Sequence, residues 1–109
     1  MLNLASRKCE NSKALIKLTD EAITTHLAQV PNWQLDPNQS AIISRFEFKN
    51  FKQLIFFINA VAFVCDQECH HPEVKFGYNW CEIAFATHDA QGLTSNDFIC
   101  AAKVNALTQ

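Results

Sequence analysis

The stretch from Ala41 to Gln67 constrains the fold most, because two hydrophobic periods follow one another there. Over Ala41–Phe48 side chains alternate with a period of two, which predicts a strand with one buried face. The period then becomes that of a helix from about Phe51 to Gln67, and Asn50 is placed to cap it. A strand and a long helix that each bury one face predict helix packed on sheet. The expected core stripe of this helix is Phe51, Leu54, Ile55, Ile58, Ala62 and Cys65.

The remaining elements complete an alternating order. Thr19 with two acidic residues after it predicts the start of a helix that Pro31 ends, and Thr94 with Asp97 three residues later resembles a capping box. The expected elements are a helix over 20–30, strands over 33–35, 74–78 and 80–85, and a last helix over 95–107 with Phe98, Ala101, Ala102 and Leu107 inward. Two hairpins predict an α+β domain with an antiparallel sheet and helices on one face.

Composition sets the number of domains and excludes some partners. With 109 residues, 49% of them hydrophobic and 18% charged, the chain is long enough for one domain with a real core. We expect a single domain over 16–109, preceded by a loosely ordered segment over 1–15 that shows no periodicity. A formal charge of -2 gives no general attraction to nucleic acid or to an anionic membrane.

The sequence predicts a cytoplasmic protein. Residues 1–13 contain no apolar segment typical of a signal peptide, and the apolar stretch Leu54–Cys65 is too short to span a bilayer. The five cysteines include no CxxC pair, so we expect mostly buried, reduced thiols rather than a disulfide framework.

The long helix has more apolar residues than one stripe requires. Phe56 and Phe63 lie close to the polar line formed by Lys52, Asn59 and Asp66. We expect these rings to form a subunit interface, since soluble monomers rarely expose such patches. The alternative is a wider groove that the N-terminal segment covers.

Three of the four histidines fall within nineteen residues. Imidazole has an ordinary pKa of about 6.5, so a cluster of histidines indicates proton transfer or metal binding. His70 and His71 follow the long helix, and His88 follows the last strand. Asp66 lies one turn before His70 if the helix persists, where its carboxylate could orient an imidazole. His26 stands alone, and we expect it to be structural.

Other chemistries fit the cluster less well. Three histidines can form a catalytic zinc site, as in a zinc hydrolase, and Cys69 could add a thiolate. Adjacent residues in extended chain point in different directions, however, so His70 and His71 are poorly spaced to share one ion. Cys69 beside His70 is only a sequence neighbour, which gives little support for a cysteine nucleophile. The alternative for each histidine is a non-functional position at the surface or at a helix end.

The spacing of these residues resembles the signature of the pterin-4a-carbinolamine dehydratase family, over about residues 18–107. The matching positions are Asp66, His70, His71, Pro72, Tyr78, His88 and Asp97, together with Trp33, Phe46-x-Phe48-x-Asn50-Phe51, Gly92-Leu93 and Asn96-Asp97-Phe98. The N-terminal segment, which shows no hydrophobic periodicity, is more like that of bacterial family members than that of animal ones. The resemblance implies a four-stranded antiparallel sheet with three helices on one face.

The resemblance also implies an enzyme, a hydro-lyase. Its reaction removes water from a 4a-hydroxytetrahydropterin to give quinonoid dihydropterin, which recycles the cofactor of aromatic amino acid hydroxylases. His70, His71 and His88 would be catalytic, without metal or organic cofactor. The residues implied to bind or orient the substrate are Asp66, Thr87, Trp33 and Asp97, although Trp33 could equally be a core residue and Asp97 a helix cap.

The resemblance also implies partners for this chain, although two positions differ from the family pattern. Family members form dimers by sheet extension and tetramers when the middle helices pack, which implies a homodimer or homotetramer here. Animal members also act as dimerisation cofactors of a transcription factor, so a non-enzymatic interaction module is the competing function. This chain departs from the family at Cys69, often acidic there, and at Val74, where animal members carry a bulky aromatic.

Overall fold

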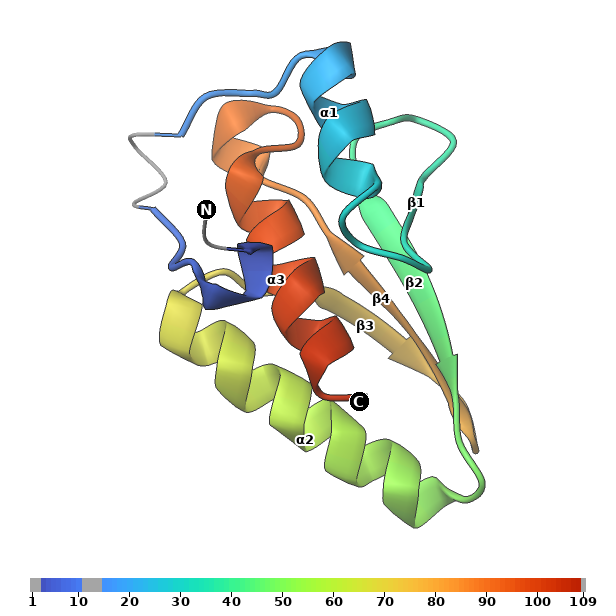
Figure 1. The fold of residues 1–109 in the computed structure, drawn as a ribbon. Helices are drawn as coiled ribbons and strands as arrows, with labels where there is room; N and C mark the ends of the chain where they lie inside the picture. Colours follow the sequence, from blue (N-terminus) through green and yellow to red (C-terminus); the bar gives the residue numbers. More distant parts are fainter. Residues whose placement is uncertain (1–2, 11–14, 109) are drawn as a thin grey trace.

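The computed structural model describes residues 3–10 and 15–108, and the chain folds as an α+β domain with a four-stranded antiparallel sheet. The strands are β1 (Gln34–Leu35), β2 (Ile42–Glu47), β3 (Glu73–Phe76) and β4 (Trp80–Phe85), in the order β1-β2-β4-β3. The helices are α1 (Asp20–Leu27), α2 (Phe51–Glu68) and α3 (Ser95–Ala106), with short 3₁₀ helices η1 (Leu4–Ser6) and η3 (His88–Ala90). In Figure 1, α2 and α3 lie across one face of the sheet, which confirms the predicted fold class.

The centre of the sheet follows the predicted alternation. In the β2–β4 pair, Ile42 lies opposite Phe85 and Ser44 opposite Ile83, and all four side chains are buried. The Ser44 hydroxyl is satisfied because it donates to the carbonyl oxygen of Asn32 at 2.8 Å. The burial along β2 therefore follows the period of two that the sequence predicts.

The core stripe of α2 is rotated from the predicted one. Phe51 and Ala62 were expected inside but are exposed, whereas Phe57 packs against Phe46 and Phe48 with ring centroids 4.9 and 5.0 Å apart. The fully buried positions are Leu54, Phe57, Val61 and Cys65. The prediction was wrong here because α2 is apolar on much of its circumference, so composition alone did not single out the narrow stripe that meets the sheet.

Element ends differ where local turns compete with the helix or strand. The first helix ends at Leu27 instead of residue 30, because the amides of Gln29 and Val30 bond three residues back, to His26 and Leu27. Leu107, expected inside, is 38% exposed. At the edge of the sheet, β3 ends at Phe76 instead of residue 78, and both Phe76 and Tyr78 are exposed.

The predicted N-caps are confirmed. The Thr19 hydroxyl accepts from the Ala22 amide at 3.2 Å, and the Asn50 side chain accepts from the Gln53 amide at 2.9 Å. The other end of α2 has no sequence signal: Cys69 caps it in the left-handed conformation, with φ 54°. Glycine usually occupies this position, because it has no Cβ to clash.

Replacing Cys69 with glycine should therefore stabilise the fold. The expected gain is about 0.5–1 kcal/mol, since glycine adopts a positive φ without the steric cost that cysteine carries. Urea unfolding followed by circular dichroism measures the change. A Cys69→Ala variant is the matched control, because it removes the thiol but keeps the Cβ, and an equal gain in that variant would contradict the backbone explanation.

The described part of the N-terminal segment lies against α3. Leu4 is buried, and the Lys103 ammonium donates to the carbonyl oxygen of Ala5 at 2.8 Å. The expected loose order over 1–15 stays a prediction, and residues 1, 2 and 11–14 lie outside the described part. Among the described residues, none of the helices combines the length and the apolar character needed to cross a membrane.

Candidate active site

The end of α2 separates the two adjacent histidines into different environments. After the left-handed Cys69 the amide of His70 bonds back to Cys65, and the chain leaves the helix. The side chain of His70 turns inward and is 11% exposed, whereas that of His71 is 65% exposed. The helix therefore does not persist to His70, so Asp66 does not contact it. Asp66 instead pairs with His71, Nε2 to Oδ1 at 3.2 Å.

The partner of His70 is Asp97, on the first turn of α3. His70 Nε2 lies 2.6 Å from Asp97 Oδ1, and the carboxylate is fully buried. The other oxygen, Oδ2, accepts from the Thr87 hydroxyl and from the Thr94 amide, both at 2.9 Å. Thr87 and Thr94 also share a hydroxyl–hydroxyl bond of 2.8 Å.

This network defines the proton positions on His70. A carboxylate only accepts hydrogen bonds, so Nε2 of His70 carries the proton that it donates to Asp97. The second ring nitrogen, Nδ1, is then the atom that can exchange a proton with a substrate. The ring is further held by stacking on Phe85, with centroids 6.0 Å apart. His70 is thus an oriented imidazole backed by a buried carboxylate.

An apolar cavity lies beside the second histidine–aspartate pair. It occupies about 510 Å³ between α2 and β3, and both Asp66 and His71 lie in its wall. Its other lining residues are Ile58, Val61, Ala62, Phe63, Cys65, Pro72 and Val74. A volume of this order suits a small bicyclic molecule. Val74, one of the two positions at which this chain departs from the family, lies in this wall.

The structure brings some of the predicted site residues together and separates others. His70, Thr87 and Asp97 form one network, and Asp66 and His71 form a second pair. His88 follows Thr87 directly and is exposed at the start of η3.

Trp33 is a core residue that reaches His70 only through Phe85. It is buried, packs against Phe85 with ring centroids 5.6 Å apart, and donates its indole N–H to Asn105 at 2.9 Å. Sequence reasoning missed Thr94 as a member of the network, although it recognised Thr94 as a helix cap. It also missed Phe85, whose only signal was its place at the end of β4.

His26 is structural in this geometry. Its Nδ1 donates to the Ala22 carbonyl oxygen at 2.7 Å, one turn back on α1, and its ring packs against Phe98 with centroids 5.1 Å apart. Among the described residues, no group of three or more His, Cys, Asp or Glu side chains is arranged to hold a metal ion.

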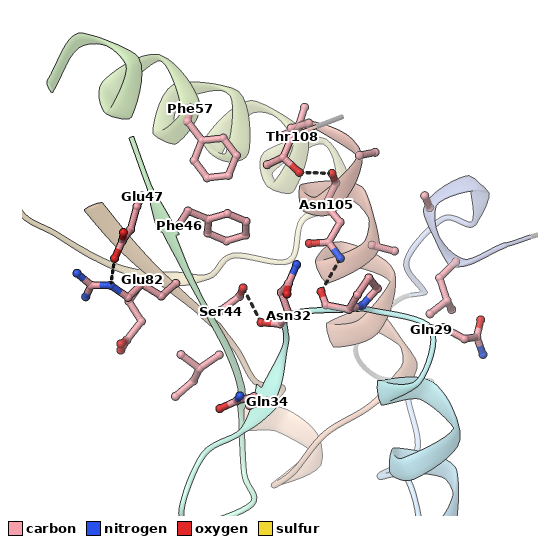
Figure 2. A pocket seen from close by; sticks show the side chains of 18 of the residues that line it. Gln29, Asn32, Gln34, Ser44, Phe46, Glu47, Phe57, Glu82, Asn105 and Thr108 are labelled. Atoms are coloured by element: carbon pink, nitrogen blue, oxygen red, sulfur yellow. Dashed lines mark hydrogen bonds and ion pairs between the residues drawn. The ribbon is translucent and has the colours of Figure 1, made fainter. Parts of the chain in front are cut away.

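A larger cavity, of about 1300 Å³, is lined by residues of β1, β2 and the C-terminal end of α3 (Figure 2). None of the predicted site residues and no histidine lines it. Two of its polar side chains bond to neighbouring backbone groups: Ser44 to the Asn32 carbonyl at 2.8 Å, and Asn105 to the Pro31 carbonyl at 3.1 Å. Volume alone would select this cavity, but the paired imidazoles place the candidate chemistry elsewhere.

The fold and the site define a small α+β domain with oriented imidazoles suited to acid–base chemistry. Comparison with known proteins makes the assignment specific: the pattern of the family described as pterin 4 alpha carbinolamine dehydratase matches residues 16–107. The chain belongs to this family, and its curated relatives are named for a dehydratase, which is a hydro-lyase.

Curated relatives align with nearly the whole chain. A protein of Nitrosomonas eutropha is 46% identical over 108 residues, covering 96% of this chain and 93% of the relative. A protein of Hydrogenovibrio crunogenus is 40% identical over 108 residues, covering 95% and 93%. Both carry the name "Putative pterin-4-alpha-carbinolamine dehydratase".

Two solved structures share the fold. A transcriptional coactivator/pterin dehydratase from Brucella melitensis superposes with a TM-score of 0.82 at 31% identity, covering 85% of this chain and 99% of that one. A pterin dehydratase-like protein described as a RuBisCO assembly factor in the alpha-carboxysome superposes with a TM-score of 0.61 at 25% identity, covering 70% and 88%.

Proposed function

We propose that this chain dehydrates a 4a-hydroxytetrahydropterin to the quinonoid dihydropterin, with His70, His71 and His88 as the proton-transfer groups. The observation that carries the proposal is the buried Asp97 carboxylate behind His70, in a chain that belongs to the dehydratase family. Asp66 and Thr87 support the histidines, and the reduced pterin is the substrate. The chemistry needs no metal or organic cofactor, because the pterin itself supplies the electrons that expel its hydroxyl group.

The reaction needs a base for the ring N–H and an acid for the departing 4a-hydroxyl. His70 is the better base, because the negative charge of Asp97, 2.6 Å away, stabilises the imidazolium that forms when Nδ1 takes a proton. The acid is then His71 or His88. His71 lines the apolar cavity, and its Nε2–H is bound to Asp66, so in the charged form of the ring the proton that His71 would donate to the hydroxyl is the second one, on Nδ1.

The physiological role follows from the product. A quinonoid dihydropterin is the form that a reductase returns to the tetrahydro state, so the reaction would recycle the cofactor of aromatic amino acid hydroxylases. We place it in the cytoplasm, because all five cysteines are free thiols in the structure, which fits a reducing compartment.

A direct assay tests the proposal. The purified chain should accelerate breakdown of chemically generated 4a-carbinolamine, followed by ultraviolet absorbance, well above the spontaneous rate. Heat-denatured protein is the control for non-specific catalysis by surface imidazoles. An acceleration no greater than that of the denatured protein would contradict the dehydratase proposal.

We further propose that the protein self-associates through the outer face of α2. Phe56 and Phe63 are 62% and 65% exposed, and the described part of the N-terminal segment does not cover them. The expected assemblies are a homodimer or a homotetramer.

Phe56→Glu should therefore shift the assembly toward smaller species, because it places a charge where an apolar contact would be buried. Light scattering at micromolar concentration measures the change. Ile16→Glu is the matched control, since Ile16 is 81% exposed and belongs to the segment before α1, where the nearby Leu18 amide bonds to Leu93. A parent protein that is strictly monomeric would remove the claim.

The same face supports a second candidate function, a non-enzymatic interaction module. The Brucella relative is described as both coactivator and dehydratase. If the carbinolamine assay is negative while the parent still self-associates through Phe56, the interaction role is favoured.

A further inference from the structure

Three cysteine thiols from distant parts of the chain meet where the N-terminal segment lies against α2 and α3. Cys65 on α2 and Cys100 on α3 are fully buried, and each affects the pKa of the other, which is lowered for Cys65 and raised for Cys100. The sulfur of Cys9 lies 3.5 Å from that of Cys100, 91 positions later in the chain. The proposed dehydratase chemistry uses none of these thiols. Thiols in contact can be oxidised to a disulfide.

The backbone on both sides of Cys9 is fixed by side chains of the two helices. The Cys9 amide donates to the Glu68 carboxylate of α2 at 2.7 Å. The next residue, Glu10, exchanges two bonds of 2.9 Å with the side-chain amide of Asn96 on α3. These three bonds hold the Cys9 sulfur over α3, where it also lies 3.8 Å from the Asn96 carbonyl oxygen. The contact with Cys100 is therefore specified by its surroundings.

The thiols differ in access to solvent. Cys9 is half-buried, so a small oxidant can reach it, whereas Cys100 has no exposed surface. Hydrogen bonds with Cys65 and Cys9, together with burial, hold the pKa of the Cys100 thiol well above its ordinary value. The thiolate is the form that oxidants attack, so Cys100 is not the first thiol to react. Oxidant enters at Cys9, and Cys100 is the resolving thiol.

We propose that Cys9 and Cys100 form a reversible intramolecular disulfide when the protein meets hydrogen peroxide. The Cys9 sulfur attacks one peroxide oxygen, the O–O bond breaks, and Cys9 becomes a sulfenic acid while water leaves. The Cys100 sulfur then displaces the hydroxyl from Cys9, and its proton leaves with that oxygen as a second water. Two thiols and one peroxide give one disulfide and two waters, with two electrons passing from sulfur to oxygen.

The movement that this step needs is small. The sulfurs must close from 3.5 Å to about 2.05 Å. Cys100 is fixed within α3, so Cys9, on the hydrogen-bonded segment, makes the approach. The disulfide would close a loop over most of the chain and tie the N-terminal segment to α3. A loop of this length restricts the unfolded chain strongly and should raise the melting temperature.

Peptide mapping tests the pairing. The full chain carrying Cys69→Ser, which removes the exposed thiol, is treated with hydrogen peroxide, quenched with catalase, alkylated in denaturant and digested without reductant. The expected result is a linked peptide joining Cys9 to Cys100, with alkylation of both falling together and returning after dithiothreitol. Cys81 is the internal reference, because burial raises the pKa of its thiol to about 11 and it should stay reduced.

Two single variants in the same background define the partners. Cys65→Ser should leave the linked peptide unchanged, whereas Cys9→Ser should abolish it. Peroxide should also raise the melting temperature of the Cys69→Ser protein by roughly 5 °C or more, and not that of the Cys9→Ser variant. A Cys65–Cys100 linkage, or oxidation of Cys9 to sulfinate without any linked peptide, would overturn the proposal.

Discussion

Replacing His70 with alanine is expected to lower kcat for carbinolamine dehydration by about 10²–10⁴, the range for losing a positioned general base. The reason is structural: His70 is the histidine whose Nε2 is held by a buried carboxylate, 2.6 Å from Asp97 Oδ1. His88→Ala should also lower kcat, but less if His71 can supply the acid. Initial rates at saturating carbinolamine measure both effects, after subtraction of the spontaneous rate.

His26→Gln is the control for this pair of variants. His26 bonds to the backbone of its own helix and packs on Phe98, so its replacement should affect stability and leave kcat near the parental value. Circular dichroism at the assay temperature separates unfolding from lost chemistry, since His70→Ala also removes one partner of the Asp97 carboxylate. If both His70→Ala and His88→Ala keep the parental kcat, the proposed roles of these histidines are wrong.

Elements with strong local signals could be predicted from the sequence. The alternation over β2 needs only a period of two, and the caps at Thr19 and Asn50 need only a side chain and an amide three residues apart. The choice between helix and strand was therefore decided within short windows. The buried face of α2 could not be predicted within such a window, because apolar residues occur around much of that helix. The contact of Phe57 with Phe46 of the sheet decides which face is buried.

The candidate site illustrates the same limit. The sequence singled out both histidines and both aspartates but could not pair them, because the pairing depends on where α2 stops. Cys69 adopts a left-handed conformation that cysteine does not signal, and this residue turns His70 inward to Asp97, 27 positions away. Asp66 then pairs with His71. Thr94, recognised only as a cap, proves to share Asp97 with His70.

Asp97 combines a helix cap with a contact to the proposed base, and two substitutions should separate these roles. Asp97→Ala removes the acceptor of three donors at once, namely His70 Nε2, the Thr87 hydroxyl and the Thr94 amide. Because the site is fully buried, water cannot replace the lost partner. The expected loss of unfolding free energy is about 3–5 kcal/mol, measured by urea denaturation.

Asp97→Asn should cost less stability than Asp97→Ala but should still lower kcat. The asparagine oxygen can still accept from Thr87 and Thr94, so the loss of stability should be only about 1–2 kcal/mol. Its NH₂ group then faces His70 Nε2, which must become an acceptor, and the proton moves to Nδ1. The neutral ring is left in the wrong tautomer for a base and without the charge that stabilises the imidazolium. We therefore expect kcat to fall by about 10² or more.

Thr19→Ala is the matched control, because it removes the cap of α1, whose hydroxyl accepts from the Ala22 amide and not from a member of the His70–Asp97 network. It should cost about 1 kcal/mol of stability with kcat unchanged. If Asp97→Asn behaves like Thr19→Ala, with lower stability and full activity, Asp97 is only a helix cap. If Asp97→Asn stays folded but is as inactive as His70→Ala, the two residues act as one unit. The double variant His70→Ala/Asp97→Asn should then be no slower than His70→Ala alone.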